Sequence, residues 1–156
     1  MQGVRRPTRR ETLWIESSAL LRILLEGDRR LAGAFRAFPR FATASLTLIE
    51  VPRAIARATR EERLSAARHR SLVQRFRSFA ASCTVAELTQ AVRDRAAAEF
   101  PVEPIRSLDA IHLAAALVSS EPLGALVIAS CDHRIRDNAH ALGFELIPAD
   151  PPAAGS

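Results

Sequence analysis

Short apolar runs and longer stretches with helical spacing follow one another along most of the chain. The short runs predict strands at 13–15, 41–44, 83–85, 126–129 and 144–147. Apolar residues three and four positions apart predict a first helix ending at Gly27 and further helices at 30–38, 46–58, 60–79, 87–100, 108–118 and 132–142. Alternating strands and helices are typical of a mainly parallel sheet covered by helix layers, so we expect an α/β fold.

Serine residues stand where several of these helices should begin. A serine hydroxyl can accept a hydrogen bond from a free N–H of the first turn. We therefore expect Ser17 or Ser18 to cap the first helix, Ser45 the third and Ser107 the sixth. Pro52 lies inside the third helix, where it removes one backbone hydrogen bond and predicts either a kink or a shifted start.

The length of 156 residues suits one domain with its own core. We expect a flexible basic leader at 1–11, the folded domain at 12–148 and a disordered tail at 149–156. No apolar run is long enough to span a bilayer, and Glu16 and Arg22 interrupt what would be the apolar part of a secretion signal. Two cysteines provide no disulfide framework. A cytoplasmic protein is the expectation.

The charge pattern favours a nucleic-acid partner. The net charge is +5, and all 22 basic side chains are arginine. Guanidinium groups pair bidentately with phosphate and stack on bases. The absence of lysine excludes a Walker-type phosphate loop and Schiff-base chemistry. It also argues against phosphoaspartate receivers and haloacid-dehalogenase-type phosphatases, both of which pair a carboxylate with a lysine.

Four carboxylates occupy positions where an α/β fold places its chemistry. Glu16 follows the first expected strand, Asp132 follows the strand at 126–129, Asp109 lies in the first turn of a helix, and Glu50 lies on another helix. Ligands of parallel sheets bind at the carboxyl ends of the strands. Converging carboxylates select Mg²⁺ or Mn²⁺, which can activate water for attack on a phosphodiester.

Each of these residues taken singly also has a structural interpretation. Aspartates at helix starts often serve as caps, and Glu50 alone would suit a surface. The partial positive charge of a helix N-terminus favours the ionised forms of Asp109 and Asp132. His112, one turn after Asp109, is expected to pack in the core or to be a partner of the carboxylates. His133 is expected to face solvent.

The segments around the four acids resemble the PIN-domain family, specifically the VapC-type toxins of bacterial toxin–antitoxin pairs. The likeness spans about 12–148 and is carried by LWIESSAL at 13–20, SLTLIEVPRA at 45–54, LDAIHLA at 108–114, SCDHR at 130–134 and ALGF at 141–144. The segment LDAIHLA is the most specific of these, and the order of the segments is more specific still.

This resemblance implies a PIN-like three-layer fold and a Mg²⁺- or Mn²⁺-dependent endoribonuclease. The catalytic and metal-binding carboxylates would be Glu16, Glu50, Asp109 and Asp132, with Ser17 and Ser130 as possible hydrogen-bonding helpers. It also implies a homodimer and a small antitoxin protein, encoded alongside, that blocks the site.

The chain departs from the family pattern at its first acid, where the family usually has Asp and this chain has Glu16. The longer side chain reaches further by roughly one C–C bond, and misplacement by about 1 Å can cost a large rate factor. The alternative is therefore a catalytically weak or inactive PIN-fold module that binds RNA or protein. A metal-dependent phosphatase or DNase is a third possibility.

Overall fold

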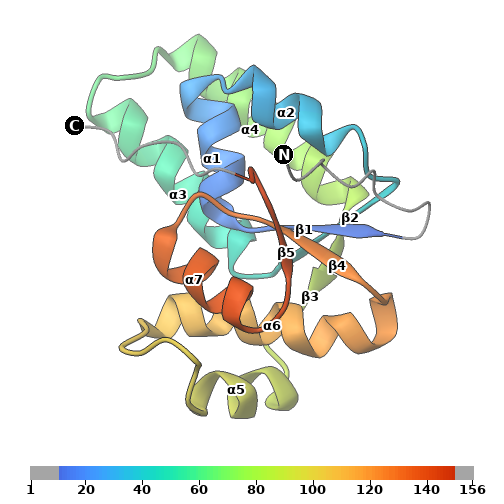
Figure 1. Ribbon diagram of the computed structural model, residues 1–156. Coiled ribbons are helices and arrows are strands. Elements are labelled where there is room, and N and C mark those ends of the chain that lie inside the picture. Colours follow the sequence, from blue (N-terminus) through green and yellow to red (C-terminus); the bar gives the residue numbers. More distant parts are fainter. Residues whose placement is uncertain (1–10, 150–156) are drawn as a thin grey trace.

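The computed structural model describes residues 11–149 of the chain (Figure 1). The described part contains five strands, β1 (Thr12–Ile15), β2 (Arg40–Ala44), β3 (Thr84–Ala86), β4 (Leu126–Ala129) and β5 (Glu145–Ile147). It also contains seven helices, α1 (Ser17–Glu26), α2 (Arg29–Phe35), α3 (Thr47–Arg60), α4 (Ala66–Ser82), α5 (Gln90–Ala97), α6 (Ser107–Leu123) and α7 (His133–Ala141). The expected leader and tail lie outside the described residues, apart from Glu11 and Ala149.

The strands form one sheet in the order β3-β2-β1-β4-β5. All neighbouring strands are parallel, and Thr12 of the central strand β1 is in register with Arg40 of β2 and Leu126 of β4. The expected α/β fold with a parallel sheet is therefore confirmed. Because the strands are parallel, their carboxyl ends share one edge of the sheet.

Helices cover both faces of the sheet and give three layers (Figure 1). The side chains of β1 alternate between two hydrophobic clusters, as the pleat of a strand requires. Trp14 packs in the cluster with α5, α6 and α7, whereas Leu13 and Ile15 pack in the cluster with α1, α2, α3 and α4. Every residue of β1 is buried, which explains its unbroken apolar character.

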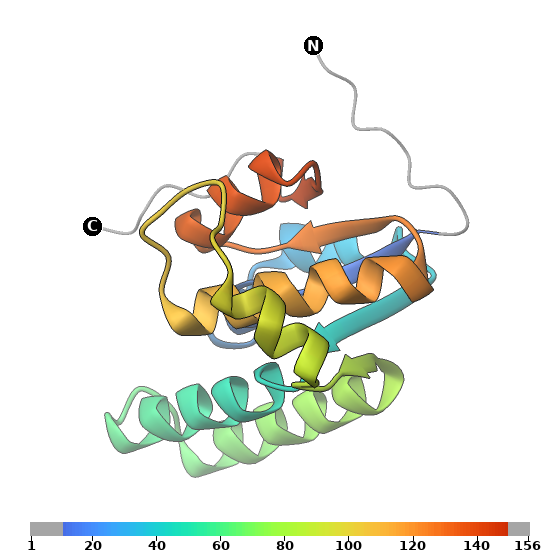
Figure 2. The same cartoon turned by 90° about the horizontal axis from the view of Figure 1, so that it is seen from below.

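The expected single helix at 60–79 is wrong. Helix α3 continues to Arg60, residues 61–65 form a turn in which Glu62 has a φ of 57°, and α4 starts afresh at Ala66. The Ser65 hydroxyl accepts a hydrogen bond of 3.1 Å from Arg68 N–H, which favours a new helix start over continuation. The turn allows α3 and α4 to lie side by side (Figure 2).

Other helix bounds shift where local hydrogen bonds outweigh apolar spacing. Helix α2 ends three residues before the expected Phe38, and α5 begins at Gln90 because Thr89 caps it. Helix α6 extends five residues past its expected end at Val118, with Pro122 in its last turn and Gly124 after it. Pro52 lies inside the continuous helix α3.

The expected serine caps are also wrong. Glu16 itself is the cap residue of α1, and its carboxylate accepts the hydrogen bond from Ser18 N–H. Leu46 precedes α3 and Arg106 precedes α6, and neither makes a side-chain cap hydrogen bond. Asp132 caps α7, as its place after β4 predicts.

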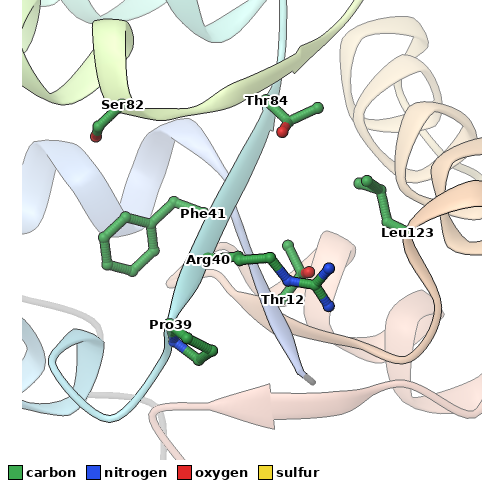
Figure 3. Close-up of a pocket in the computed structure, with 7 residues that line it drawn as sticks. All are labelled: Thr12, Pro39, Arg40, Phe41, Ser82, Thr84 and Leu123. Carbon is green, nitrogen blue, oxygen red and sulfur yellow. The ribbon is translucent and has the colours of Figure 1, made fainter. Parts of the chain in front are cut away.

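A pocket of ≈ 280 Å³ lies at the amino-terminal edge of the sheet, away from the carboxylates (Figure 3). It is lined by the first residues of three strands and by neighbouring side chains, namely Thr12, Pro39, Arg40, Phe41, Ser82, Thr84 and Leu123. The carboxylates lie at the opposite edge, where ligands of parallel sheets bind. No helix within 11–149 is long and apolar enough to cross a membrane.

Candidate functional site

Glu16 and Asp132 lie at the carboxyl ends of the adjacent central strands β1 and β4. Ser130 connects them, because its hydroxyl donates a 2.9 Å hydrogen bond to Glu16 Oε2 and accepts a 3.2 Å bond from the backbone N–H of Asp132. Parallel pairing of Ile15 with Ala129 places the two turns side by side. The first and last of the four candidate acids are thus neighbours in the fold.

The carboxylate of Glu16 is 4 % exposed and held on several sides. Ser18 donates to it through both its backbone N–H and its hydroxyl, and that hydroxyl also accepts a 2.9 Å bond from Cys131 N–H. Burial raises the pKa of Glu16, and the charge of His112 together with the serine hydrogen bonds offsets only part of that rise. Glu16 is therefore a firmly placed carboxylate whose negative charge is costly without a nearby cation.

Glu50 reaches the site from the first turn of α3. Its Oε1 accepts hydrogen bonds from the Ser17 hydroxyl at 2.8 Å and from His112 Nε2 at 2.5 Å. The Ser17 hydroxyl also lies 3.2 Å from Thr47 Oγ1, which is fully buried. Partial burial raises the pKa of Glu50, but His112 and Ser17 outweigh it, so the pKa of this carboxyl is lowered.

His112 is buried, and it does more than fill the core. Its Nε2 lies 4.0 Å from Glu16 Oε1 in addition to its bond with Glu50. Burial lowers its pKa, but the hydrogen bond that it donates to Glu50 and the charges of Glu16, Glu50 and Asp109 raise the pKa by more, so the net shift is upward. Of the two interpretations offered by the sequence, the structure supports a partner of the carboxylates. When it is protonated, His112 places positive charge between Glu16 and Glu50.

Arg106 joins the two remaining acids. Its Nε donates to Asp109 Oδ2 at 2.8 Å, and Nη2 donates to Asp132 Oδ2 at 3.3 Å. Asp109 is buried, whereas Arg106 is 59 % exposed. The other oxygen of Asp132 accepts the N–H groups of Arg134 and Ile135 at the start of α7. Asp109 and Asp132 thus share one guanidinium.

The structure therefore brings all four expected carboxylates together at the carboxyl edge of the sheet, through hydrogen bonds and the 4.0 Å contact between His112 Nε2 and Glu16 Oε1. Their oxygens are the ligands that Mg²⁺ and Mn²⁺ prefer, and His112 and Arg106 lie among them and donate hydrogen bonds to them. Among residues 11–149, however, no three acidic, histidine or cysteine side chains stand close enough to hold a metal ion. The donors fit a divalent cation chemically, and binding one requires the side chains to rearrange.

The sequence did not assign two participants to the site, namely Ser18, which was expected only as a possible helix cap, and Arg106. Ser18 directly follows the helper Ser17, and Arg106 stands three residues before Asp109 across a helix start. The second spacing is a recognised signal, because side chains three residues apart meet on a helix. The bridge from Arg106 to Asp132 spans 26 residues and has no local signal. His133 is exposed, as expected.

Comparison with known proteins identifies the family of the chain. The PIN domain family model matches residues 14–141. Ribonuclease VapC35 of Mycobacterium tuberculosis is 37% identical over 142 residues, covering 86% of this chain and 95% of the relative. Ribonuclease VapC45 of the same species is 32% identical over 139 residues, covering 88% and 95%.

Two solved structures share the fold at low sequence identity. A toxin–antitoxin complex from Klebsiella pneumoniae has a TM-score of 0.61 at 18% identity, covering 90% of this chain and 99% of that one. VapBC2 from Rickettsia felis, bound to a DNA fragment from its promoter, has a TM-score of 0.60 at 8% identity, covering 86% and 96%. With the family model matching most of the chain and relatives covered almost end to end, the chain belongs to the PIN-domain family and has VapC-type ribonucleases among its relatives.

Proposed function

We propose that this chain is a VapC-type toxin, an endoribonuclease that hydrolyses RNA phosphodiester bonds with Mg²⁺ or Mn²⁺ bound by Glu16, Glu50, Asp109 and Asp132. The single observation that carries the proposal is the joining of these four carboxylates at one edge of the sheet. The relatives named as VapC ribonucleases support the substrate class.

The cation, when bound, would activate a water molecule and stabilise charge on the phosphate. Neighbouring side chains of the protein hold the carboxylate ligands in place. Ser18 and Ser130 fix the Glu16 carboxylate, and Ser17 with His112 fixes Glu50. The helix start at α7 holds one oxygen of Asp132 and leaves the other directed to the network. These hydrogen bonds keep the carboxylates at one edge of the sheet, which limits how far they must move to bind the cation.

Exposed arginines on α3 suit the RNA backbone. Arg53 and Arg57 follow Glu50 by one and two helical turns, and both are exposed. A line of guanidinium groups leading away from the carboxylates can contact successive phosphates, which gives affinity that falls with salt. This surface would hold the strand while the carboxylate network acts on one phosphodiester.

A cytoplasmic toxin of this type would need a partner that suppresses it. The two solved structures compared above are a toxin–antitoxin complex and VapBC2, which supports a small antitoxin protein as the partner here. A homodimer follows from the family resemblance. Light scattering after size-exclusion chromatography, alone and after co-expression with the neighbouring open reading frame, tests both assemblies.

The decisive experiment is a calorimetric titration of Mn²⁺ into purified protein, followed by RNA cleavage with and without EDTA. We expect Asp109→Asn to weaken Mn²⁺ binding at least tenfold and to abolish cleavage, because it removes a carboxylate charge from the cluster. Asp94→Asn, at an exposed aspartate on α5, is the matched control and should behave as wild type.

The outcome also decides between the proposed enzyme and the alternative. Cleavage that EDTA abolishes and Asp109→Asn removes supports the ribonuclease. RNA binding without Mn²⁺ binding or cleavage in the folded wild-type protein would favour a non-catalytic PIN-fold module. Cleavage of DNA or small phosphoesters in preference to RNA would instead support the third possibility.

A further inference from the structure

Arg106 stands at the open side of the carboxylate network. It directly precedes α6, and its guanidinium bonds to one carboxylate on α6 and to another at the start of α7. Within 11–149, these two carboxylates account for its hydrogen bonds and ion pairs. Since the side chain is mostly exposed, its other N–H groups remain accessible to a ligand.

A divalent cation bound by Asp109 and Asp132 must compete with this guanidinium. Arg106 donates to Oδ2 of both residues, and the second oxygen of Asp132 is already engaged by the α7 backbone. A cation that binds through Oδ2 of both aspartates therefore displaces Arg106 from both of them. After a cation has replaced it, the guanidinium remains near the site, because Arg106 is only three residues before Asp109 in the chain.

Building on the proposed function, we propose that Arg106 is a substrate-contacting residue that exchanges these carboxylates for the RNA phosphate. A guanidinium offers paired donors that match the two non-bridging oxygens of a phosphodiester. Its positive charge at that place would stabilise the charge that builds on the phosphate during hydrolysis. Arg106 makes and breaks no covalent bond in this role.

The proposed exchange predicts that removing Arg106 changes Mn²⁺ affinity and the rate of RNA cleavage in opposite directions. Removing Arg106 removes a competitor for Asp109 and Asp132, so Mn²⁺ should bind more tightly. The same change removes a phosphate contact, so cleavage should slow. An arginine that only stabilises the helix start would behave differently, because its loss would disorder both aspartates and weaken metal binding and cleavage together.

The test compares wild type with Arg106→Gln, Arg106→Lys and Arg63→Gln. Arg63 is a matched control, because it is 58% exposed and donates through Nε and Nη2 to Glu61 in the turn before α4. Mn²⁺ affinity is measured by calorimetry without RNA, and single-turnover RNA cleavage at saturating Mn²⁺. Thermal unfolding in EDTA checks that each variant is folded.

We expect Arg106→Gln to bind Mn²⁺ at least threefold more tightly and to cleave at least tenfold more slowly. Arg106→Lys should bind Mn²⁺ much as wild type and recover part of the rate, since it keeps the charge but loses the paired donors. Arg63→Gln should change neither quantity.

Unchanged or weaker Mn²⁺ binding in folded Arg106→Gln would overturn the inference, and so would an unchanged rate. These results differ from failure of the proposed function. In that case wild type itself would bind no Mn²⁺ and cleave no RNA, whatever stands at position 106.

Discussion

His112 Nε2 lies 2.5 Å from Glu50 Oε1 and connects two helices on opposite faces of the sheet. Helix α6 packs in one hydrophobic cluster and α3 in the other, so this contact crosses the carboxyl edge where the two layers meet. The two residues are 62 positions apart in the chain. The layers are therefore held together at the site by a charged contact as well as by the sheet.

Substitutions of His112 should show how much its hydrogen bond to Glu50 contributes to stability. We expect His112→Leu to lower the free energy of unfolding by about 1–3 kcal/mol, because buried carboxylate oxygens lose their donor. His112→Gln keeps an N–H donor for Glu50 and should lose less. Urea unfolding at pH 7 in EDTA measures both. Equal stability of His112→Leu and wild type would show that the contact with Glu50 contributes nothing.

The stability of the protein in EDTA should depend on pH in a defined direction. The pKa of His112 is raised in the fold, so its contribution is fully present below about 6.5 and is lost as pH rises through the folded value. The raised pKa of Glu16 acts in the same direction above 4.5. The lowered pKa of Glu50 acts oppositely, and its contribution is lost as pH falls below 4.5.

Urea midpoints between pH 4 and pH 8.5 check this expectation. By these three groups, wild type should be most stable near pH 4.5 and should lose stability toward pH 8.5. His112→Gln should show a flatter alkaline side, because the titrating imidazole is gone. An alkaline slope that is the same in both proteins would contradict the role assigned to His112.

Glu16 should matter more for the cation than for the fold. We expect Glu16→Gln to bind Mn²⁺ at least tenfold more weakly, because a ligand charge is removed. At pH 8 in EDTA it should be at least as stable as wild type, because burial makes the ionised carboxyl costly. Glu16→Asp keeps the charge and should retain Mn²⁺ binding. Calorimetry and urea unfolding provide both readouts, and a Glu16→Gln protein with unchanged Mn²⁺ affinity would remove Glu16 from the ligand set.

The thiol of Cys83 should be unreactive. Burial raises its pKa to about 12, against a hydrogen bond from Ser82 that lowers it slightly. At pH 8 the thiolate fraction is then roughly a thousandth of that of a thiol with the ordinary value, since each pKa unit is tenfold. Iodoacetamide labelling followed by mass spectrometry should leave Cys83 unmodified in the folded protein and label it in urea. Rapid labelling without urea would show that the strand β3 opens.

Local pattern was sufficient for the strands and for much of the site. The apolar runs around Trp14 and Ile128 are buried on both faces, and a buried parallel strand requires such a run. Once these runs are strands of a parallel sheet, Glu16 and Asp132 must lie at the same edge. The sequence could therefore indicate the placement of these acids, together with the helix start that holds Asp132.

Helix bounds were less predictable, because they depend on competition between local hydrogen bonds. Apolar spacing continues past Arg60, yet the Ser65 hydroxyl starts a new helix. Glu16 caps α1 in place of either serine, since its carboxylate is held against Ser18 by the packed turn after β4. Alternative helix starts differ by a small free energy that depends on the capping hydrogen bonds, and the spacing of apolar residues carries no information about it.

By itself, the sequence determined the strand order along the chain, the parallel α/β fold and the edge at which the acids gather, because these follow from periodicity and from the geometry of parallel strands. Only the tertiary structure decided which basic side chain bonds to which carboxylate. His112 meets Glu50, and Arg106 joins Asp109 to Asp132, through the packing of separate helices. Contacts between distant segments depend on how helices pack, and no local spacing specifies that.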